Sequence, residues 1–470
     1  MKKREATSIS NLFKSAIVLG TIGLMAAAFI AGTYVEQALL ALPDRVNFRQ
    51  CLPWFTLFTL ATMYFNSVFD YSRRKHHLLF SAFTSILLIN VLMMALPFFE
   101  VLYYVRVSTI IIIIALEYSF VSAWILFTHR LWRKMNPPVS SVLFCADKKR
   151  GNEIARKINT MKTTNRIDRV VLYDEVSFPS VVKRYKAIFL DNPQPEIKNS
   201  ISLYTWEKKK DLIILPDIYD LIINNATLVQ FDDIMVYRAK PIGLTLEQRF
   251  IKRAIDIIGS AIALVLLSPV MLVIAILVKR DGGPVFYTQK RITRGGREFK
   301  LYKFRTMVPD AEKLTGPVLA MKDDPRITKI GQKLRQLRLD EIPQFWNTLK
   351  GDMSLVGPRP EREHFIELYK ETIPEYEYRT MVRAGITGLA HVLGKYNTTP
   401  EERIRLDLTY LQNYSLFLDL KIMIETLRVI FTKDYAEGIE EPKERSGSAE
   451  PAPKEEKLAG VAVPYWKEKV

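Results

Sequence analysis

Five long apolar runs dominate this sequence of 470 residues. Four of them lie in the first third, at residues 15–34, 51–69, 78–99 and 107–128. Each is close to the ~20 residues that a helix needs to cross the hydrocarbon core of a bilayer. We therefore predict a membrane protein with four transmembrane helices in residues 1–134. We expect the first helix to be retained and not removed as a signal peptide.

Basic residues beside these runs predict their orientation. Clusters precede the first run, separate the second from the third and follow the fourth, whereas the opposite loops hold three arginines. Because basic residues stay on the cytoplasmic side, the N-terminus and everything after residue 130 should be cytoplasmic. The clusters are Lys2, Lys3, Arg4 and Lys14, then Arg73, Arg74 and Lys75, then Arg130, Arg133 and Lys134.

The fifth apolar run, residues 257–278, contains Ser268 and Pro269 near its centre. A proline inside a helix clashes with the carbonyl four residues earlier, here that of Val265, at a cost of about 3 kcal/mol. The Ser268 hydroxyl could bond a carbonyl freed in this way. Basic clusters flank both ends of the run, so a crossing helix would put one of them on the wrong side of the membrane. We predict a re-entrant helix, with a fifth, kinked span as the alternative.

One acidic residue, Glu117, lies within the fourth run. An ionised carboxylate there costs on the order of 2.5–3.5 kcal/mol on insertion scales. It could serve a packing or subunit contact, or touch the path of a lipid substrate. We favour the structural role.

Residues 137–245 alternate strand-like and helical patterns, which predicts a small doubly wound parallel sheet, a Rossmann-like cytoplasmic domain. The first strand-to-helix turn, residues 146–151, has one glycine where a dinucleotide fingerprint needs three. We therefore expect a spacer, regulatory or dimerisation module and no nucleotide site. The predicted strands are residues 140–145, 169–173, 187–190, 212–215 and 234–237.

Composition excludes several other classes of protein. A net charge of +17 suits nucleic acid or an anionic membrane surface. The apolar runs favour the membrane, and no nucleic-acid recognition motif accompanies the charge. Two cysteines, Cys51 and Cys145, give no disulfide framework, and the five histidines lack the spacing of a zinc site. Residues 436–470 are rich in Glu, Pro, Lys, Ala and Ser, which predicts a disordered tail.

Residues 249–435 contain most of the residues suited to catalysis. Asp340 and Glu341 lie just before Pro343, a residue suited to a first helical turn. Alone they would be taken for helix-capping residues, but arginines crowd the same block, and guanidinium groups suit phosphate oxygens. A carboxylate pair with arginines is a plausible Mg²⁺–diphosphate site. The arginines are Arg326, Arg335, Arg338 and Arg359, and the motifs are GPVFYTQKR (283–291), KFRTM (303–307), DPRIT (324–328), LDEIPQ (339–344) and GPRP (357–360).

In order and spacing these motifs resemble the bacterial sugar transferase family, the monotopic polyprenyl-phosphate hexose-1-phosphate transferases. The resemblance runs from about residue 252 to residue 434, and the set of motifs is specific although each is weak alone. The four-span start and Rossmann-like middle domain resemble the family's long form. The resemblance implies a re-entrant helix joined to an α-rich cytoplasmic catalytic domain. It also implies Asp340 as nucleophile and Glu341 as its partner, chiefly a Mg²⁺ ligand.

The resemblance also assigns roles to other residues. Lys252 and Arg253 would anchor the re-entrant helix at the membrane surface, and Ser268 with Pro269 would turn it. Two positions depart from the family pattern: Ala384 replaces a common proline, and His391 replaces the usual glutamine, a change that concerns acceptor or sugar contacts. The nucleotide diphosphate would be held by Pro358, Arg359 and Pro360, and the further substrate-binding candidates are Lys303, Arg305, Arg326, Arg335 and Arg338.

The implied function is transfer of a hexose 1-phosphate from a UDP-sugar to polyprenyl (undecaprenyl) phosphate, with release of UMP. This would be the initiating step of surface polysaccharide synthesis. The protein would be a multi-pass protein of the bacterial inner membrane with its catalytic domain on the cytoplasmic side, and the resemblance to the family's long form suggests a homodimer. One alternative is the same reaction without a covalent intermediate, with Asp340 as base or metal ligand. Another is a catalytically lapsed membrane scaffold, which the presence of Asp340, Glu341 and Arg359 disfavours. No residue indicates which sugar is transferred or which polysaccharide is built.

Overall fold

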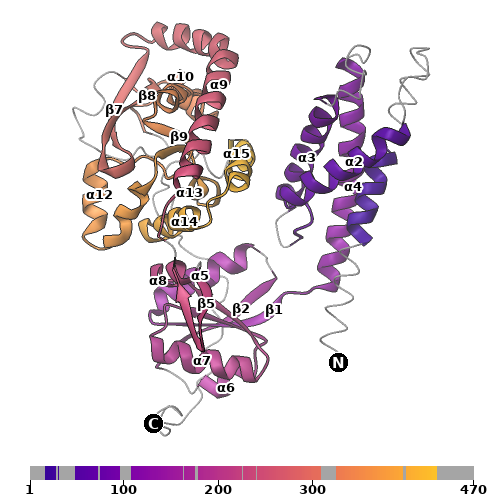
Figure 1. Cartoon of the computed structure of the whole chain (residues 1–470), viewed down its shortest axis with the longest axis vertical. Coiled ribbons are helices and arrows are strands. Elements are labelled where there is room, and N and C mark those ends of the chain that lie inside the picture. The colour runs from indigo at the N-terminus through magenta and orange to yellow at the C-terminus, as the bar shows by residue number, and fades with distance from the viewer. Residues whose placement is uncertain are drawn as a thin grey trace. The chain divides into compact units, whose positions relative to one another are not determined.

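A computed structural model describes residues 16–27, 30, 48–71, 75–95, 107–161, 164–174, 178–224, 226–239, 241–308, 324–394 and 398–430 (Figure 1). The chain divides into two compact units, the first running to Leu215 and the second starting at Pro216. The predicted tail, residues 436–470, lies outside the described residues.

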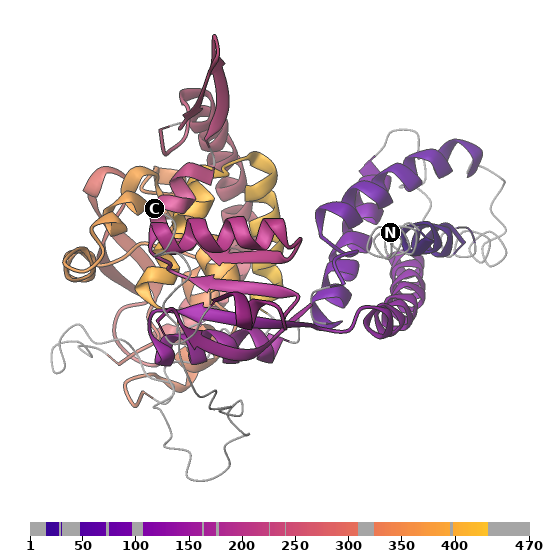
Figure 2. The ribbon, with the colours of Figure 1, turned by 90° about the horizontal axis from the view of Figure 1, so that it is seen from below.

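The N-terminal part of the first unit is a bundle of helices that lie side by side in both Figure 1 and Figure 2. Each of the four predicted spans contains helix, and all four contribute to one apolar core. The segment Ile111–Met135 is long and apolar enough to cross a membrane, whereas Ala16–Ala27 and Trp54–Phe65 are shorter apolar helices. The bundle contains a helix at 16–27, α2 (Phe48–Phe65), α3 (Lys75–Ala95) and α4 (Val107–Met135).

Polar side chains join the helices of this bundle. Glu117 is fully buried and accepts a hydrogen bond of 2.8 Å from the Asn90 amide, which links α4 to α3. Asn66 likewise donates to the Ser85 hydroxyl at 2.8 Å. A buried polar group without such a partner would cost free energy. The Asn90 contact is consistent with the structural role that we favour for Glu117.

The rest of the first unit is built on a four-stranded parallel sheet in the order β2-β1-β3-β4. Its core includes Val142, Phe144, Ile188 and Leu190, all buried. The parallel sheet agrees with the predicted βα alternation over its first four strands. The elements are β1 (Val139–Cys145), α5 (Lys148–Met161), β2 (Asn165–Leu172), α6 (Phe178–Val182), β3 (Ala187–Asp191), α7 (Pro195–Glu207) and β4 (Asp211–Leu215).

The fifth predicted strand, residues 234–237, does not belong to that sheet, and this part of the prediction is wrong. It forms β6 (Ile234–Arg238), which pairs antiparallel with β5 (Thr227–Phe231). Two residues connect these strands, and the first of them, Asp232, has a φ of 54°. A two-residue connection with positive φ is typical of a hairpin, and aspartate tolerates that conformation.

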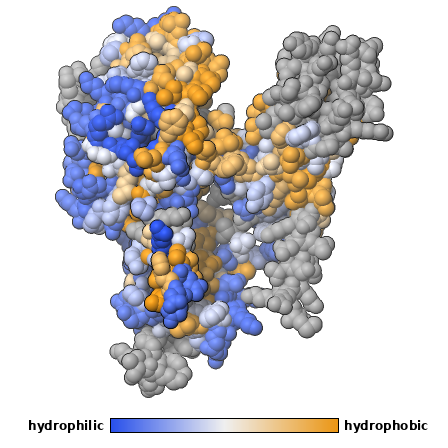
Figure 3. Space-filling view, in the orientation of Figure 1, coloured by the Kyte–Doolittle hydropathy of each residue, from blue (hydrophilic) through white to orange (hydrophobic). Residues whose placement is uncertain are grey.

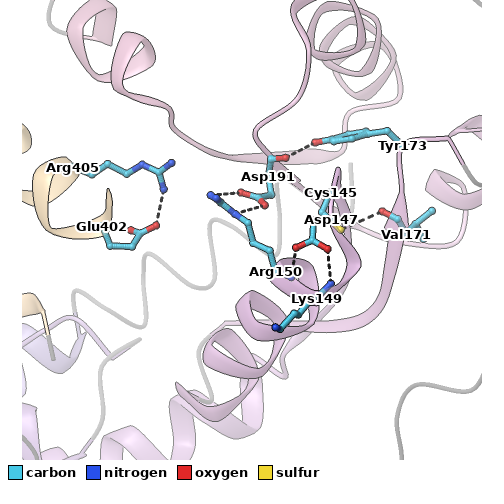
Figure 4. Close-up of polar contacts among 9 residues, drawn as sticks. All are labelled: Cys145, Asp147, Lys149, Arg150, Val171, Tyr173, Asp191, Glu402 and Arg405. Carbon is cyan, nitrogen blue, oxygen red and sulfur yellow. Dashed lines mark hydrogen bonds and ion pairs between the residues drawn. The ribbon is translucent and has the colours of Figure 1, made fainter. Parts of the chain in front are cut away.

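The carboxyl ends of the parallel strands are occupied by the protein's own side chains (Figure 4). The Asp147 carboxylate accepts hydrogen bonds from the backbone N–H groups of Lys149 and Arg150, both at 3.1 Å, in the first turn of α5. The Arg150 side chain in turn forms an ion pair of 2.9 Å with Asp191. The N–H groups of Lys149 and Arg150 thus have an acceptor within the protein.

The second unit contains one long helix, α9 (Leu246–Arg280), of 35 residues. Its start is fixed by a capping box, in which Thr245 and Gln248 bond each other's backbone N–H groups. Pro269 lies inside the helix, and the Ser268 hydroxyl donates to the Val265 carbonyl at 2.7 Å. The sequence predicted that proline would free this same carbonyl.

The contacts of α9 show that it bends. Arg253 donates to the carbonyls of Thr348 and Leu349 at 2.7 and 2.8 Å, whereas Val278 packs in the same cluster as Ile342. Arg253 and Val278 are 25 positions apart, which a straight helix spans as about 37 Å. Thr348 and Ile342 are six positions apart, or about 9 Å in helical geometry. Both arms of α9 therefore contact one short segment, and Figure 1 shows the change of direction in the ribbon.

Most of the α9 surface is apolar and exposed. In its most apolar window only 11% of the residues are buried, and this helix is also long and apolar enough to cross a membrane. Figure 3 shows the corresponding hydrophobic area over α9. Surface of this kind is expected to face lipid or another apolar partner.

The remaining elements pack around the arms of α9. A hairpin of β7 and β8 and a parallel pair of β9 and β10 are joined by short helices. These remaining helices and strands are α8 (Ile218–Asn224), β7 (Phe286–Ile292), β8 (Glu298–Phe304), α10 (Lys329–Gln336), α11 (Gln344–Lys350), β9 (Met353–Val356), α12 (Glu363–Lys370), β10 (Ala384–Thr387), α13 (Leu389–Leu393), α14 (Pro400–Gln412) and α15 (Leu416–Ile430), with 3₁₀ turns η2 (Arg294–Gly296), η3 (Leu339–Glu341) and η4 (Pro374–Met381).

Candidate active site

The carboxylate pair lies in η3, between α10 and α11. Arg338, which precedes η3, has a φ of 57°, a left-handed conformation that is uncommon for a residue other than glycine. Such conformations cost of order 1 kcal/mol or more and persist where the surroundings determine them. The neighbours on either side of the pair, Leu339 and Ile342, pack into the apolar cluster with the second arm of α9. The backbone of the pair is therefore fixed by the core.

Glu341 lies between two cations that are distant in sequence. Lys303 of β8 is 2.7 Å from its Oε1, and Arg359, in the loop after β9, is 3.1 Å from the same oxygen. Burial alone would raise the pKa of Glu341. The charges of Lys303, Arg359 and Arg338 outweigh burial and hold that pKa well below its ordinary value. Glu341 is therefore ionised at neutral pH.

Asp340 is buried, with an exposed fraction of 6%. Burial raises its pKa, and the neighbouring charge of Glu341 raises it further, whereas Lys303, Arg335 and Arg338 act in the opposite direction. Two adjacent carboxylates thus have pKa values that are shifted apart. Groups separated in this way are frequent in active sites. Four of the basic candidates, Lys303, Arg335, Arg338 and Arg359, act on this pair.

Arg359 is held by several contacts, including its ion pair with Glu341. One of its guanidinium nitrogens, Nη1, contacts Nε2 of His391 on α13, and its own carbonyl accepts a hydrogen bond of 2.9 Å from Arg379. Burial and then the Arg359 charge hold the pKa of His391 well below its ordinary value. The imidazole is therefore neutral, and since arginine only donates, Nε2 is the acceptor. The flanking Pro358 and Pro360 are buried and shape the turn.

Two of the predicted substrate-binding arginines have other partners. The Arg305 guanidinium donates to the backbone carbonyls of Val278, Gly282, Pro284 and Met307. These bonds tie the end of α9 to β8 and occupy most of the donors of this side chain. Arg326 forms a two-pronged pair with Asp324, at 2.8 and 2.6 Å. Neither residue shifts the pKa of the carboxylate pair in the way that Lys303 and Arg359 do.

The hairpin residues Lys252 and Arg253 make internal contacts. Lys252 is buried and forms an ion pair with Asp419 of α15, beside the rings of Tyr410 and Tyr414. Arg253 donates to the last carbonyls of α11, as described above. The contacts of these two residues therefore fasten the first arm of α9 to the catalytic unit, where we had expected an anchor at the lipid surface.

Some residues that support the site are not evident from the sequence. Arg379 contacts Tyr376 at 2.7 Å and Asp407 at 3.0 Å, in addition to the carbonyl of Arg359. The sequence signal for His391 is its departure from the family pattern. No periodicity or motif in the sequence predicts Arg379 or Asp407 as parts of this network.

The carboxylate pair fits a hard divalent cation. Both contacts of Glu341 with Lys303 and Arg359 end on Oε1, so Oε2 is engaged by neither. Within the described ranges no group of three or more His, Cys, Asp or Glu side chains could hold a metal. Mg²⁺ commonly uses one or two carboxylates together with substrate phosphates and water. Asp340 and Glu341 therefore match the type of donor that this cation takes.

Comparisons with known proteins identify the class. Residues 247–433 match the bacterial sugar transferase family model. The exopolysaccharide production protein ExoY of Rhizobium meliloti is 40% identical over 194 residues, which cover 38% of this chain and 84% of that protein. The chain belongs to the bacterial sugar transferase family.

Two longer relatives are also similar to part of the chain. The UDP-N-acetylgalactosamine-undecaprenyl-phosphate N-acetylgalactosaminephosphotransferase of Aeromonas hydrophila is 45% identical over 187 residues, 39% of this chain and 44% of that protein. The UDP-glucose:undecaprenyl-phosphate glucose-1-phosphate transferase of Xanthomonas campestris pv. campestris is 40% identical over 229 residues, 47% of each chain. The chain thus spans about half the length of these curated relatives.

Proposed function

We propose that this protein transfers a sugar 1-phosphate from a UDP-sugar to polyprenyl phosphate and releases UMP. The observation on which this mainly rests is the fixed position of Glu341 between Lys303 and Arg359, directly beside the buried Asp340. A buried carboxylate pair among cations suits a reaction in which negative charge moves between phosphorus centres. The names of the relatives support the same substrates.

The proposed mechanism has two displacement steps. An Asp340 carboxylate oxygen attacks the phosphorus next to the sugar, the bond from that phosphorus to the bridging oxygen breaks, and UMP leaves with the bond's electrons. An oxygen of polyprenyl phosphate then attacks the same phosphorus and breaks its bond to Asp340. The product is a polyprenyl diphosphate sugar, and the carboxylate is regenerated. Covalent catalysis divides one difficult transfer into two easier ones.

The other residues position and neutralise charge. Glu341 stays ionised because of its two cations, and Arg359 can direct its remaining donors to the diphosphate. Asp340 and Glu341 would hold Mg²⁺, which neutralises diphosphate charge when bound. Burial shifts the pKa of Asp340 upward, and a bound cation would act in the opposite direction and favour the ionised, nucleophilic carboxylate.

We also propose a membrane location for the site. The bent α9 has an exposed apolar surface, and both of its arms contact the segment that carries Asp340. A re-entrant helix of this kind would keep the site at the cytoplasmic face of the inner membrane, where the lipid phosphate lies. The four N-terminal helices would then be transmembrane, the parallel-sheet domain would be a Rossmann-like accessory module, and a homodimer is the assembly that we expect.

Release of UMP tests the proposal directly. Purified full-length protein is given polyprenyl phosphate, Mg²⁺ and each of several UDP-sugars, and the screen also identifies the sugar. The Asp340→Asn variant should lose both turnover and the trapping of a labelled sugar phosphate on the protein. The exposed Asp281 provides a matched control, and Asp281→Asn should retain activity. Turnover by Asp340→Asn would disprove the nucleophile, and exchange of labelled UMP without lipid would separate the covalent route from direct attack.

A further inference from the structure

The backbone around Arg359 is fixed, but its long side chain needs contacts of its own. The carbonyl of Arg359 accepts from the Arg379 side chain at 2.9 Å, and the Pro358 carbonyl accepts from the backbone N–H of Gly385 at 2.8 Å. Beyond this backbone the Arg359 side chain is 38% exposed. An arginine side chain loses much rotamer freedom when it is held in one geometry, so the backbone bonds alone do not fix the guanidinium group.

Two contacts from different elements hold that guanidinium group. Its Nη2 donates to Oε1 of Glu341 in η3 at 3.1 Å, and its Nη1 contacts Nε2 of His391 in α13. Because the group is planar, bonds at two of its nitrogens fix both its position and its plane. These bonds use two of the five N–H donors of Arg359. Among the described residues the other three donors have no hydrogen-bond partner.

His391 reaches Arg359 from a fixed position. A Cβ on Gly388, the residue before α13, would lie 2.1 Å from the Gly357 carbonyl oxygen, so α13 begins directly against the turn that carries Arg359. Val392, the next residue after His391, is buried in an apolar cluster. Within the described part of the chain, the contact with Arg359 is the one hydrogen bond of the His391 side chain. The imidazole is therefore committed to the guanidinium group.

We infer that His391 is a positioning residue of the donor site, whose imidazole holds Arg359 in the orientation in which its three remaining N–H groups bind the diphosphate of the UDP-sugar. A neutral imidazole accepts a hydrogen bond without neutralising the charge of the arginine. A second carboxylate in its place would compete with the phosphate oxygens for the same donors. The inference rests on the proposed function and deepens it by adding a residue that acts through Arg359.

Kinetics of full-length protein in one detergent test this role. His391→Phe keeps a planar ring but removes the acceptor, and it should lower kcat/KM for the UDP-sugar about tenfold or more. Because the diphosphate belongs to the donor, kcat/KM for polyprenyl phosphate should change far less. His391→Gln, whose amide oxygen can accept in place of Nε2, should recover most of the loss. The control is His364→Phe, the same substitution at an exposed position of α12.

Three kinetic results would each overturn the inference. They are an unchanged kcat/KM for the UDP-sugar in His391→Phe, an equal fall for both substrates, and a His391→Gln variant as impaired as His391→Phe. Thermal unfolding of each variant checks that the protein is folded. If His391→Phe does not fold, His391→Leu takes its place, because leucine also lacks an acceptor and needs no extra space for a ring.

A binding measurement separates this inference from the proposed function. Titration calorimetry with UDP and Mg²⁺ needs no turnover, and His391→Phe should raise the dissociation constant about tenfold or more. In an Arg359→Leu background the same substitution should add little, because its partner is already gone. An equal effect in both backgrounds would show that His391 does not act through Arg359. Coupling of the two residues in a protein without transferase activity would support the inference and refute the function, and activity with UDP binding that is independent of His391 would do the reverse.

Discussion

The ion pair between Lys303 and Glu341 gives the most specific prediction for stability. Replacement by methionine (Lys303→Met) keeps the length and apolar stem of the side chain but removes its charge. Glu341 has a side-chain exposure of 12% and is left with Arg359 alone, whose side chain is 38% exposed. Breaking a buried ion pair costs about 3–5 kcal/mol when a charge is left unpaired. Because Arg359 remains, we expect the free energy of unfolding to fall by about 2 kcal/mol, which corresponds to a fall in Tm of roughly 4–8 °C for a unit of this size.

The loss should depend on pH in a defined direction. The pKa of Glu341 is lowered in the folded protein, so its ionised form contributes stability above the ordinary pKa of glutamate, about 4.3. That contribution is lost as the pH falls through the lowered folded value. The difference between wild type and Lys303→Met should therefore be constant from pH 8 to about 5 and shrink at lower pH.

Thermal unfolding of the full chain in a single detergent measures both effects. Lys300→Met is the matched control, because Lys300 is an exposed residue of the same strand. A change at such a surface position is usually within about 0.5 kcal/mol. Equal losses in the two variants, or a loss in Lys303→Met that does not change with pH, would refute the assignment of the low pKa to Lys303.

Three further predictions concern the frame of the catalytic unit. Arg305→Leu should lower the free energy of unfolding by about 3 kcal/mol or more and sharply reduce the yield of folded protein, because four carbonyls lose a buried donor. A normal yield and Tm would contradict a structural role for Arg305. Gly331→Ala should lower Tm measurably, since its Cβ would lie 2.0 Å from the Thr306 carbonyl oxygen. Pro269→Ala should let α9 straighten, and labelling of Glu247→Cys and Lys279→Cys with an impermeant thiol reagent checks this. Both cysteines should label from one side of the membrane in the parent protein and from opposite sides in the Pro269→Ala background. Labelling from opposite sides in the parent would exclude the re-entrant arrangement.

The sequence predicted best what local chemistry determines. The partner of Ser268 could be named in advance, because proline frees the carbonyl four residues earlier whatever the rest of the fold does. The first four strands of the parallel sheet followed from their apolar runs. The strand at 234–237 was misplaced because the two-residue connection before it was not recognised as a hairpin turn.

Contacts between distant positions could not be predicted in this way. Lys303 and Arg305 belong to one short motif, and strand alternation would treat them alike. The structure separates them because β8 ends at Phe304. Lys303 then reaches Glu341, while Arg305 turns to the carbonyl of Val278, near the end of α9, and to those of Gly282 and Pro284, which follow the helix. Only the packing of α9, β8 and η3 distinguishes the residue beside the carboxylates from the residue that supports the fold.

One arm of α9 contacts the last turn of α11 through Arg253, and the other packs with Ile342, just before this helix of seven residues begins. Because a helix of this length cannot stretch, a wider angle at Pro269 would either break the contact of one arm with α11 or displace α11 as a whole. Glu341 lies three positions before α11 and would move with that helix. Under the membrane location that we propose, the angle between the arms of α9 and the position of the catalytic carboxylates would change together, so a detergent that opens this angle would lower activity without contacting a catalytic residue.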